Sequence, residues 1–157
     1  MNETPGIDSR QLDLAAMREL LKLEHRDGKL FVADPIRKSR VRCTPEEFVR
    51  QLAVAWLISH YKLGRGSILI EKQLLAGTRH RRFDIVVLDK LLQPWMLVEC
   101  KAPEVPIDDS TWRQATAYNT AVRAPHIWLT NGHSQILGSW NAQRMSFERQ
   151  RFFPVKN

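Results

Sequence analysis

The sequence predicts a mixed α/β domain in which a central sheet of about five strands is flanked by helices. Apolar residues first recur at helical spacing, then alternate over three neighbouring segments, and the same change is repeated once further along the chain. With 157 residues the chain has room for one domain with a sizeable core. Its composition, 43% hydrophobic and 26% charged, is typical of a folded globular protein. The predicted order is therefore helix, three strands, helix and two strands.

The first predicted element is an amphipathic helix over residues 8–25, where leucines and alanines recur mostly at helical spacing. The Asp27-Gly28 turn ends this segment, so residues 1–28 are interpreted as a helical extension that precedes the main domain. A short strand is expected over residues 29–33, where KLFVA begins the main domain.

A second helix is predicted from Pro45 to Tyr61. Thr44 can cap its first turn, Pro45 suits the first helical position, and the acids Glu46 and Glu47 suit the positive end of the helix dipole. The residues expected to form its buried stripe are Phe48, Leu52, Ala55 and Trp56.

The pattern changes to strands after this helix. Strands are predicted over 67–74, 83–88 and 95–100, followed by a helix from Asp108 or Ser110 to about Val122 and strands over 126–130 and 135–140. The main domain is expected to span 29–141, and 142–157 is interpreted as a basic and aromatic tail. The sequence leaves open whether the tail's phenylalanines fold back onto the sheet or mediate association; they are Phe147, Phe152 and Phe153.

The charge of the chain favours polyanionic partners, nucleic acid first among them. Its 24 Lys and Arg outnumber its 17 Asp and Glu, which gives a net charge of +7. Two basic clusters are interpreted as phosphate contacts rather than as solvated surface; they comprise Arg37, Lys38, Arg40 and Arg42, and Arg79, Arg81 and Arg82. Such contacts predict salt-sensitive binding with little sequence specificity.

Other classes of protein are disfavoured. Cys43 and Cys100 form no CxxC pair, and no histidines stand at ligand spacing, so neither a disulfide framework nor a zinc site is expected. The first residues lack the basic and apolar regions of a signal peptide, and no apolar run approaches the roughly 20 residues of a membrane span. We therefore expect a cytoplasmic protein that stays in solution.

The most informative residues are three charged side chains on two neighbouring predicted strands: Asp84, Glu99 and Lys101. Alternation along a strand places Glu99 and Lys101 on one face, and Cys100 on the other. A carboxylate that follows Met-Leu-Val is costly unless a cation or hydrogen bonds compensate it, and a Mg²⁺ or Mn²⁺ ion shared with Asp84 would do so. Lys101 could then orient the attacking water. The simplest alternative is a cross-strand salt bridge on an exposed face.

This arrangement resembles the PD-(D/E)xK nuclease signature. The stretches DPIRKSRVRCTPEEFVRQ, RRFDIVVLD, LVECKAP, QATAYN and LTNG resemble, in this order, the N-terminal nuclease domain of type I restriction enzyme R subunits and its stand-alone relatives. The resemblance covers about residues 34–140 and implies a restriction-endonuclease-like core. Two features depart from the family: Phe83 stands where the signature has proline, and no GxxxxGK[ST] loop is present, so no ATP-driven translocation is expected.

The resemblance implies roles for individual residues. Asp84, Glu99 and the main-chain carbonyl of Cys100 would be metal ligands, and Lys101 would be the catalytic lysine. Gln114 and Tyr118 match the QxxxY motif of the RecB-like branch, and they share one face of a helix. The first helix of the family often supplies a glutamate as well, for which Glu47 is the candidate and Glu46 the alternative. Glu71, on the first predicted strand, is either a further acidic neighbour of the site or a solvent-facing residue, and the second interpretation is favoured.

The predicted function is Mg²⁺- or Mn²⁺-dependent hydrolysis of DNA phosphodiester bonds, with endonuclease action favoured. The alternatives are a non-catalytic or partner-dependent DNA-binding and docking module of a restriction-modification or DNA-processing system, and cleavage of RNA in place of DNA. DNA is the expected partner, together with a second copy of the chain or a motor or modification subunit. No membrane and no nucleotide cofactor are expected.

Overall fold

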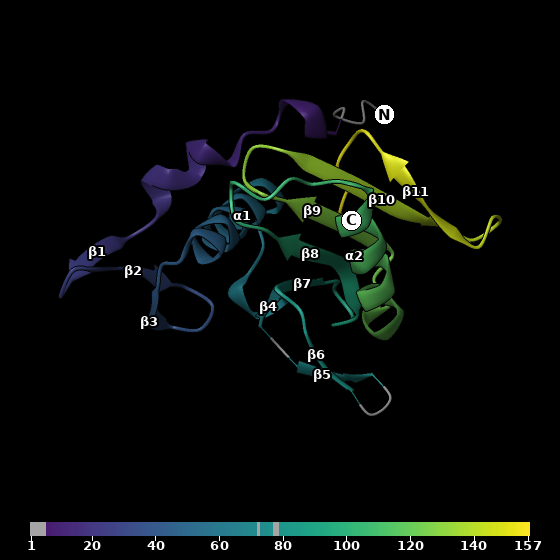
Figure 1. Cartoon of the computed structure of the whole chain (residues 1–157). Coiled ribbons are helices and arrows are strands. Elements are labelled where there is room, and N and C mark those ends of the chain that lie inside the picture. The colour runs from purple at the N-terminus through teal and green to yellow at the C-terminus, as the bar shows by residue number, and fades with distance from the viewer. Residues whose placement is uncertain (1–5, 72, 77–78) are drawn as a thin grey trace.

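A six-stranded sheet forms the centre of the molecule (Figure 1). The computed structural model describes residues 6–71, 73–76 and 79–157, and of residues 73–76 and 79–81 only the backbone course is described. The strand order is β11-β10-β9-β8-β7-β4, and every pairing is antiparallel except that of β8 with β9. The strands are β4 (Ile68–Ile70), β7 (Ile85–Leu88), β8 (Pro94–Cys100), β9 (His126–Thr130), β10 (Gln135–Asn141) and β11 (Ser146–Gln150).

Two helices cover the two faces of this sheet. On one face, α1 (Pro45–Tyr61) packs Leu52 and Trp56 against a cluster that includes Val87 and Met96. On the other face, α2 (Asp109–Val122) covers the strand residues that alternate with these, such as Leu97. This layering confirms the predicted mixed α/β class and is consistent with a restriction-endonuclease-like core. The sheet has six strands, where about five were predicted.

Both helices begin where the sequence predicts. The hydroxyl of Thr44 accepts a hydrogen bond from the Glu47 N–H at 3.1 Å, and Pro45 occupies the first turn of α1. The carboxylate of Asp108 accepts from the N–H groups of Ser110 and Thr111, which completes a capping box at the start of α2. Because α2 joins the parallel strands β8 and β9, it carries the chain back along the sheet.

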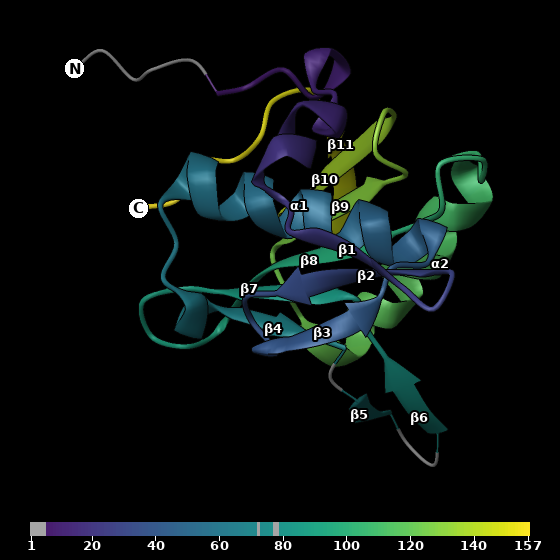
Figure 2. The ribbon, with the colours of Figure 1, turned by 90° about the vertical axis from the view of Figure 1, so that its left-hand side faces the viewer.

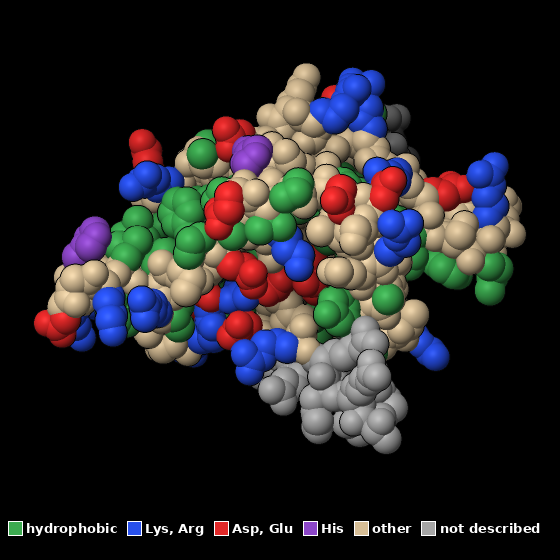
Figure 3. All heavy atoms as spheres, in the orientation of Figure 1, with side chains coloured by type: hydrophobic (Ala, Val, Ile, Leu, Met, Phe, Trp, Pro, Cys, Tyr) green, Lys and Arg blue, Asp and Glu red, His purple; other side chains and the backbone are tan. Residues whose placement is uncertain are grey.

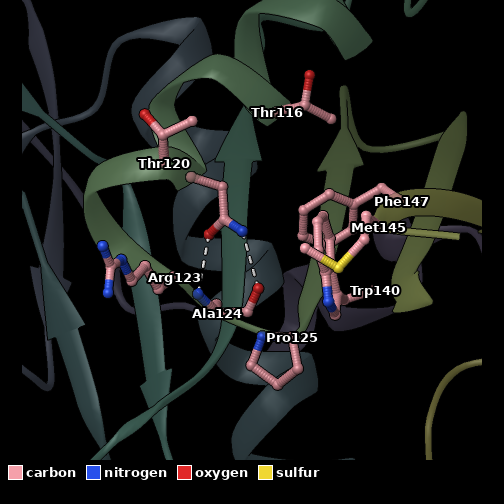
Figure 4. A pocket seen from close by; sticks show the side chains of 9 residues that line it. Thr116, Thr120, Arg123, Ala124, Pro125, Trp140, Met145 and Phe147 are labelled. Carbon is pink, nitrogen blue, oxygen red and sulfur yellow. Dashed lines mark hydrogen bonds between the residues drawn. The ribbon is translucent and has the colours of Figure 1, made fainter. Parts of the chain in front are cut away.

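The C-terminal end of α2 is held by a buried asparagine. The side chain of Asn119 donates to the Ala124 carbonyl at 2.8 Å and accepts from the Ala124 N–H at 3.1 Å (Figure 4). Beside it lies a cavity of about 760 Å³ between this end of α2 and the β10–β11 hairpin, whose walls include Trp140, Met145 and Phe147.

We expect Asn119→Ala to lower the free energy of unfolding by about 1–3 kcal/mol, because it leaves both polar groups of Ala124 unsatisfied in a buried position. Urea denaturation followed by circular dichroism measures this loss. Thr120→Ala is the matched control on the same turn, because that side chain is exposed. Equal stability of the Asn119 variant and the wild type would contradict the expectation.

The N-terminal segment departs from the prediction. The helix predicted over residues 8–25 is wrong: the chain forms the 3-10 helices η1 (Ser9–Gln11) and η2 (Leu14–Leu20) and then the strand β1 (Leu23–Arg26). Leu14 is fully buried in the α1-side core, and η2 packs along α1. Tertiary contacts thus stabilise two 3-10 helices and a strand here, and not the regular helix that the leucine spacing predicted.

A small sheet lies outside the central one, beside α1 (Figures 1 and 2). It pairs β1 with β2 (Lys29–Asp34) and β2 with β3 (Ser39–Arg42). The boundary predicted after residue 28 therefore falls inside the β1–β2 hairpin. The strand predicted over 67–74 is also divided, because Glu71 adopts a φ of 49° between β4 and β5 (Gln73–Ala76). β5 pairs with β6 (Arg79–Arg82) in a separate hairpin.

The C-terminal segment is part of the fold. Within the predicted tail, β11 forms an edge of the central sheet, and Phe153 is buried against Trp56 and Trp128. Residues 7–9 run beside 151–153, joined by hydrogen bonds such as Phe153 N–H to the Ile7 carbonyl at 2.9 Å. In the described ranges, none of the helices has the length and apolar character needed to cross a membrane.

Candidate active site

The strand register brings Asp84 and Glu99 together. β7 and β8 are antiparallel with Ile85 opposite Val98, so the preceding Asp84 lies opposite Glu99. The Cys100 N–H donates to Asp84 Oδ2 at 2.9 Å, which fixes the Asp84 carboxylate against the end of β8. The two carboxylates predicted from the sequence are therefore neighbours.

Glu99 is buried without full compensation. Its residue is 7% exposed, and its Oε1 atom has no hydrogen-bond partner among the described residues. Burial and the negative charge of Asp84 raise the pKa of Glu99 above its usual range. A buried carboxylate oxygen with no donor, beside a second carboxylate, is the environment in which a bound cation would offset the cost of burial.

This donor set fits a hard divalent cation held by few protein ligands. Across the described part of the chain, no group of three or more His, Cys, Asp or Glu side chains is arranged to hold a metal ion. Mg²⁺ is commonly bound through one or two carboxylates, with water and substrate phosphate as the other ligands. Asp84 and Glu99 supply two carboxylates of this kind.

Lys101 comes directly after the end of β8, where its charge acts on these carboxylates. Its N–H donates to the Thr130 carbonyl at 2.9 Å, which continues the pairing of β8 with β9. Burial and the charge of Asp84 raise the pKa of Glu46 as well as that of Glu99, and the ammonium group of Lys101 opposes both shifts. Its charge thus acts directly on the acidic side chains of the site. Cys100 is buried in the α1-side core, on the opposite face, which confirms the predicted alternation.

Arg50 is a site residue that the sequence analysis missed. It lies in the first turns of α1 with a side chain only 5% exposed, and its Nη2 contacts Asp84 Oδ1 at 2.6 Å. Burial alone would lower the pKa of Arg50, but the carboxylates of Asp84 and Glu47 outweigh burial and raise it. Arg50 is therefore a permanent positive charge in the site.

A network of ion pairs extends from Arg50 to the small sheet. Glu47, 6% exposed, binds both Arg50 and Arg37, and Gln51 donates to it at 3.0 Å. Arg37 also binds Asp34 and contacts Glu71 at 3.0 Å. The network joins α1, the β2–β3 turn and the end of β4 to the carboxylate pair. On the face of the molecule shown in Figure 3, acidic side chains gather with basic ones near the middle.

Glu71 belongs to this network, so its interpretation as a solvent-facing residue is wrong. Its N–H donates to the Asp84 carbonyl at 2.9 Å, and its carboxylate contacts Arg37 and, at 3.3 Å, Arg50. The positive φ of Glu71 turns the chain at this point, away from regular strand geometry.

The two glutamates at the start of α1 have different surroundings. Glu47, the candidate metal ligand, is enclosed by Arg37, Arg50 and Gln51. Glu46 is exposed, and its pKa responds to the charges of both Asp84 and Lys101. Glu46 is therefore the more exposed of the two, with Arg50 at 3.6 Å, whereas Glu47 is engaged in the network. The metal-ligand role of either glutamate stays a prediction.

The QxxxY residues lie on α2, which covers the same face of the sheet as Glu99. Tyr118 is half-buried and packs against the cluster around Leu97 and Val122. Gln114 is exposed one turn earlier on the helix. Their catalytic roles stay predictions.

The basic side chains predicted to contact phosphate differ in their exposure and in how many carboxylates they already bind. Arg37 is committed to three carboxylates and is 24% exposed, and Arg40 is exposed but pairs with Glu24. Lys38 is exposed at the β2–β3 turn, and Arg82 is exposed at 3.9 Å from Glu71. The side chains of Arg79 and Arg81 lie outside the described residues.

A sequence model of the family described as "Type I restriction enzyme R protein N terminus (HSDR_N)" matches residues 45–154. Among solved structures, the chain is similar to a fragment of a putative HsdR subunit of a type I restriction enzyme from Vibrio vulnificus, with a TM-score of 0.48 and 16% identity over 72% of this chain. The match covers 24% of that fragment, so this chain spans about a quarter of its length. No curated protein matches.

Proposed function

The chain belongs to the family of type I restriction enzyme R protein N-terminal domains, and on this premise we propose that it is a nuclease that hydrolyses phosphodiester bonds in DNA with a divalent cation. The observation that carries the proposal is the unpartnered, buried Oε1 of Glu99 beside Asp84, with Lys101 two residues further along the chain.

Asp84 and Glu99 would hold the cation, with the main-chain carbonyl of Cys100 as a third ligand. When bound there, Mg²⁺ or Mn²⁺ would lower the pKa of a ligated water and stabilise negative charge on the phosphate. The Cys100 N–H orients Asp84 for this task by donating to Oδ2, while Arg50 pairs with Oδ1. The sheet register sets the position of Glu99 opposite Asp84.

Lys101 would act on the nucleophile and the phosphate. Its ammonium group can orient the attacking water and offset charge that develops on the phosphate oxygens. Exposed basic residues beside the site, Lys38 and Arg82 among them, would hold the DNA backbone without reading its sequence. Gln114 and Tyr118 would contact the ligated water or a phosphate from α2.

The family, described by the R proteins of type I restriction enzymes, supports a role for this activity in a restriction system. These 157 residues contain no GxxxxGK[ST] loop, so the activity proposed for this domain includes no ATP-driven movement of DNA. A partner-dependent form of the function is therefore the second candidate, in which a motor or modification subunit delivers the DNA.

A cleavage assay tests the proposal. Supercoiled, linear and single-stranded DNA are incubated with the chain and Mg²⁺ or Mn²⁺, alongside Lys101→Ala and an EDTA control. We expect cutting that EDTA and Lys101→Ala both abolish, while Lys90→Ala, which removes an exposed lysine from the β7–β8 turn, cuts at the wild-type rate. Unchanged cutting by Lys101→Ala would refute the assigned site. Salt-sensitive DNA binding without cutting would favour the partner-dependent form.

A further inference from the structure

Arg50 contacts four acidic side chains of the candidate site, which are Glu46, Glu47, Glu71 and Asp84. Its two terminal nitrogens contact Asp84 at 2.6 Å, Glu71 at 3.3 Å and Glu46 at 3.6 Å, and one of them also binds Glu47. With a side chain 5% exposed, the guanidinium is largely shielded from water. Its charge therefore acts on these carboxylates with little screening.

This position makes Arg50 a competitor of the cation for Asp84. Asp84 Oδ2 already accepts the Cys100 N–H, and Arg50 binds Oδ1, so both oxygens of the carboxylate have a partner. A divalent cation on Asp84 would share the carboxylate with a guanidinium that repels it. Arg50 can avoid this repulsion by pairing with Glu46 and Glu71 alone. These two side chains lie within 3.6 Å of its nitrogens and are partly exposed.

We propose that Arg50 is a positioning residue that serves as the internal counter-cation of Asp84 and weakens binding of the divalent cation to the DNA-free site. When the cation binds, Arg50 exchanges Asp84 for Glu46 and Glu71. Because DNA phosphate brings further ligands and negative charge, the site then loads its cation chiefly in the complex with DNA. This inference rests on the proposed function, whose metal site it takes as given.

The chain offers a matched control in its second network arginine. Arg37 also binds Glu47 and Glu71, but its remaining partner is Asp34, far along the network from the carboxylate pair. Arg37→Gln and Arg50→Gln therefore remove the same charge from the same network, and only Arg50→Gln frees an oxygen of Asp84.

Binding of Mn²⁺ to the full chain without DNA, measured by calorimetry and by loss of the free-ion electron paramagnetic resonance signal, tests the proposal. We expect Arg50→Gln to bind Mn²⁺ about tenfold more tightly than the wild type, Arg50→Lys to lie between them, and Arg37→Gln to match the wild type. Loss of a merely structural contact would weaken binding, so a tighter site is specific to this role. Circular dichroism verifies that each variant is folded, and Arg50→Lys, which keeps the charge, provides the comparison if Arg50→Gln does not fold.

Unchanged or weaker Mn²⁺ binding by Arg50→Gln would overturn the proposal, as would equal tightening by Arg37→Gln, which would assign the effect to network charge in general. If neither the wild type nor any variant binds Mn²⁺ without DNA, the proposal about Arg50 is overturned, because Arg50→Gln should open the DNA-free site. The proposed function fails separately, if the wild type neither cleaves DNA nor binds Mn²⁺ in the presence of DNA.

Discussion

Asp84→Asn is expected to reduce cation-dependent DNA cleavage by roughly a thousandfold, which corresponds to about 4 kcal/mol of lost transition-state stabilisation. The asparagine keeps the size of the side chain and can still accept the Cys100 N–H, but it removes the charge with which Asp84 would hold the cation. It also leaves the buried Arg50 without one of its four carboxylate partners. Single-turnover cleavage of plasmid DNA at saturating enzyme measures the effect on chemistry apart from DNA binding.

A control residue at the other end of β7 separates the effect of charge from that of position. Asp89, just after β7, accepts hydrogen bonds from the N–H groups of Leu91 and Gln93, and Asp89→Asn can keep both. We expect this variant to cleave DNA at the wild-type rate. Asp84→Asn that cleaves as fast as Asp89→Asn would place the catalytic site elsewhere.

The elements that sequence predicts well are those with local signals. The start of α1 follows from the Thr44 cap, Pro45 and the acids of the first turn, all within four residues. The pairing of Asp84 with Glu99 joins two short strands that are close together in the sequence, and a register shift between Val87 and Leu88 sets its alignment. Lys101 then needs only the alternation of side chains along β8.

The elements that sequence misses depend on distant partners. Residues 14–20 have the leucine spacing of a helix, yet Leu14 is buried and its N–H donates to the Gly132 carbonyl, so contacts across the fold override local preference. Arg50 follows Glu46 and Glu47 at the spacing of surface ion pairs, which hides its burial. The pairing of Arg50 with Asp84 becomes visible only when the fold brings the start of β7 close to α1.

The adjacent glutamates of α1 provide a test of which one is structural. We expect Glu47→Gln to lower the free energy of unfolding by about 3–5 kcal/mol, because it removes a buried carboxylate that neutralises both Arg37 and Arg50. Glu46→Gln should change stability by less than about 1 kcal/mol, since Glu46 is exposed and 3.6 Å from Arg50. Urea denaturation of the two variants beside the wild type measures both values.

The same pair also bears on catalysis, because the two side chains face different groups. If Glu46 assists the carboxylate pair, Glu46→Gln will slow cleavage in a protein of normal stability, whereas Glu47→Gln will act mainly through loss of the folded state. Cleavage measured at a temperature where both variants are fully folded separates these effects. A stable Glu47→Gln protein that has lost cleavage and Mn²⁺ binding would reverse the assignment and make Glu47 the metal ligand, with Arg37 and Arg50 as its counter-charges.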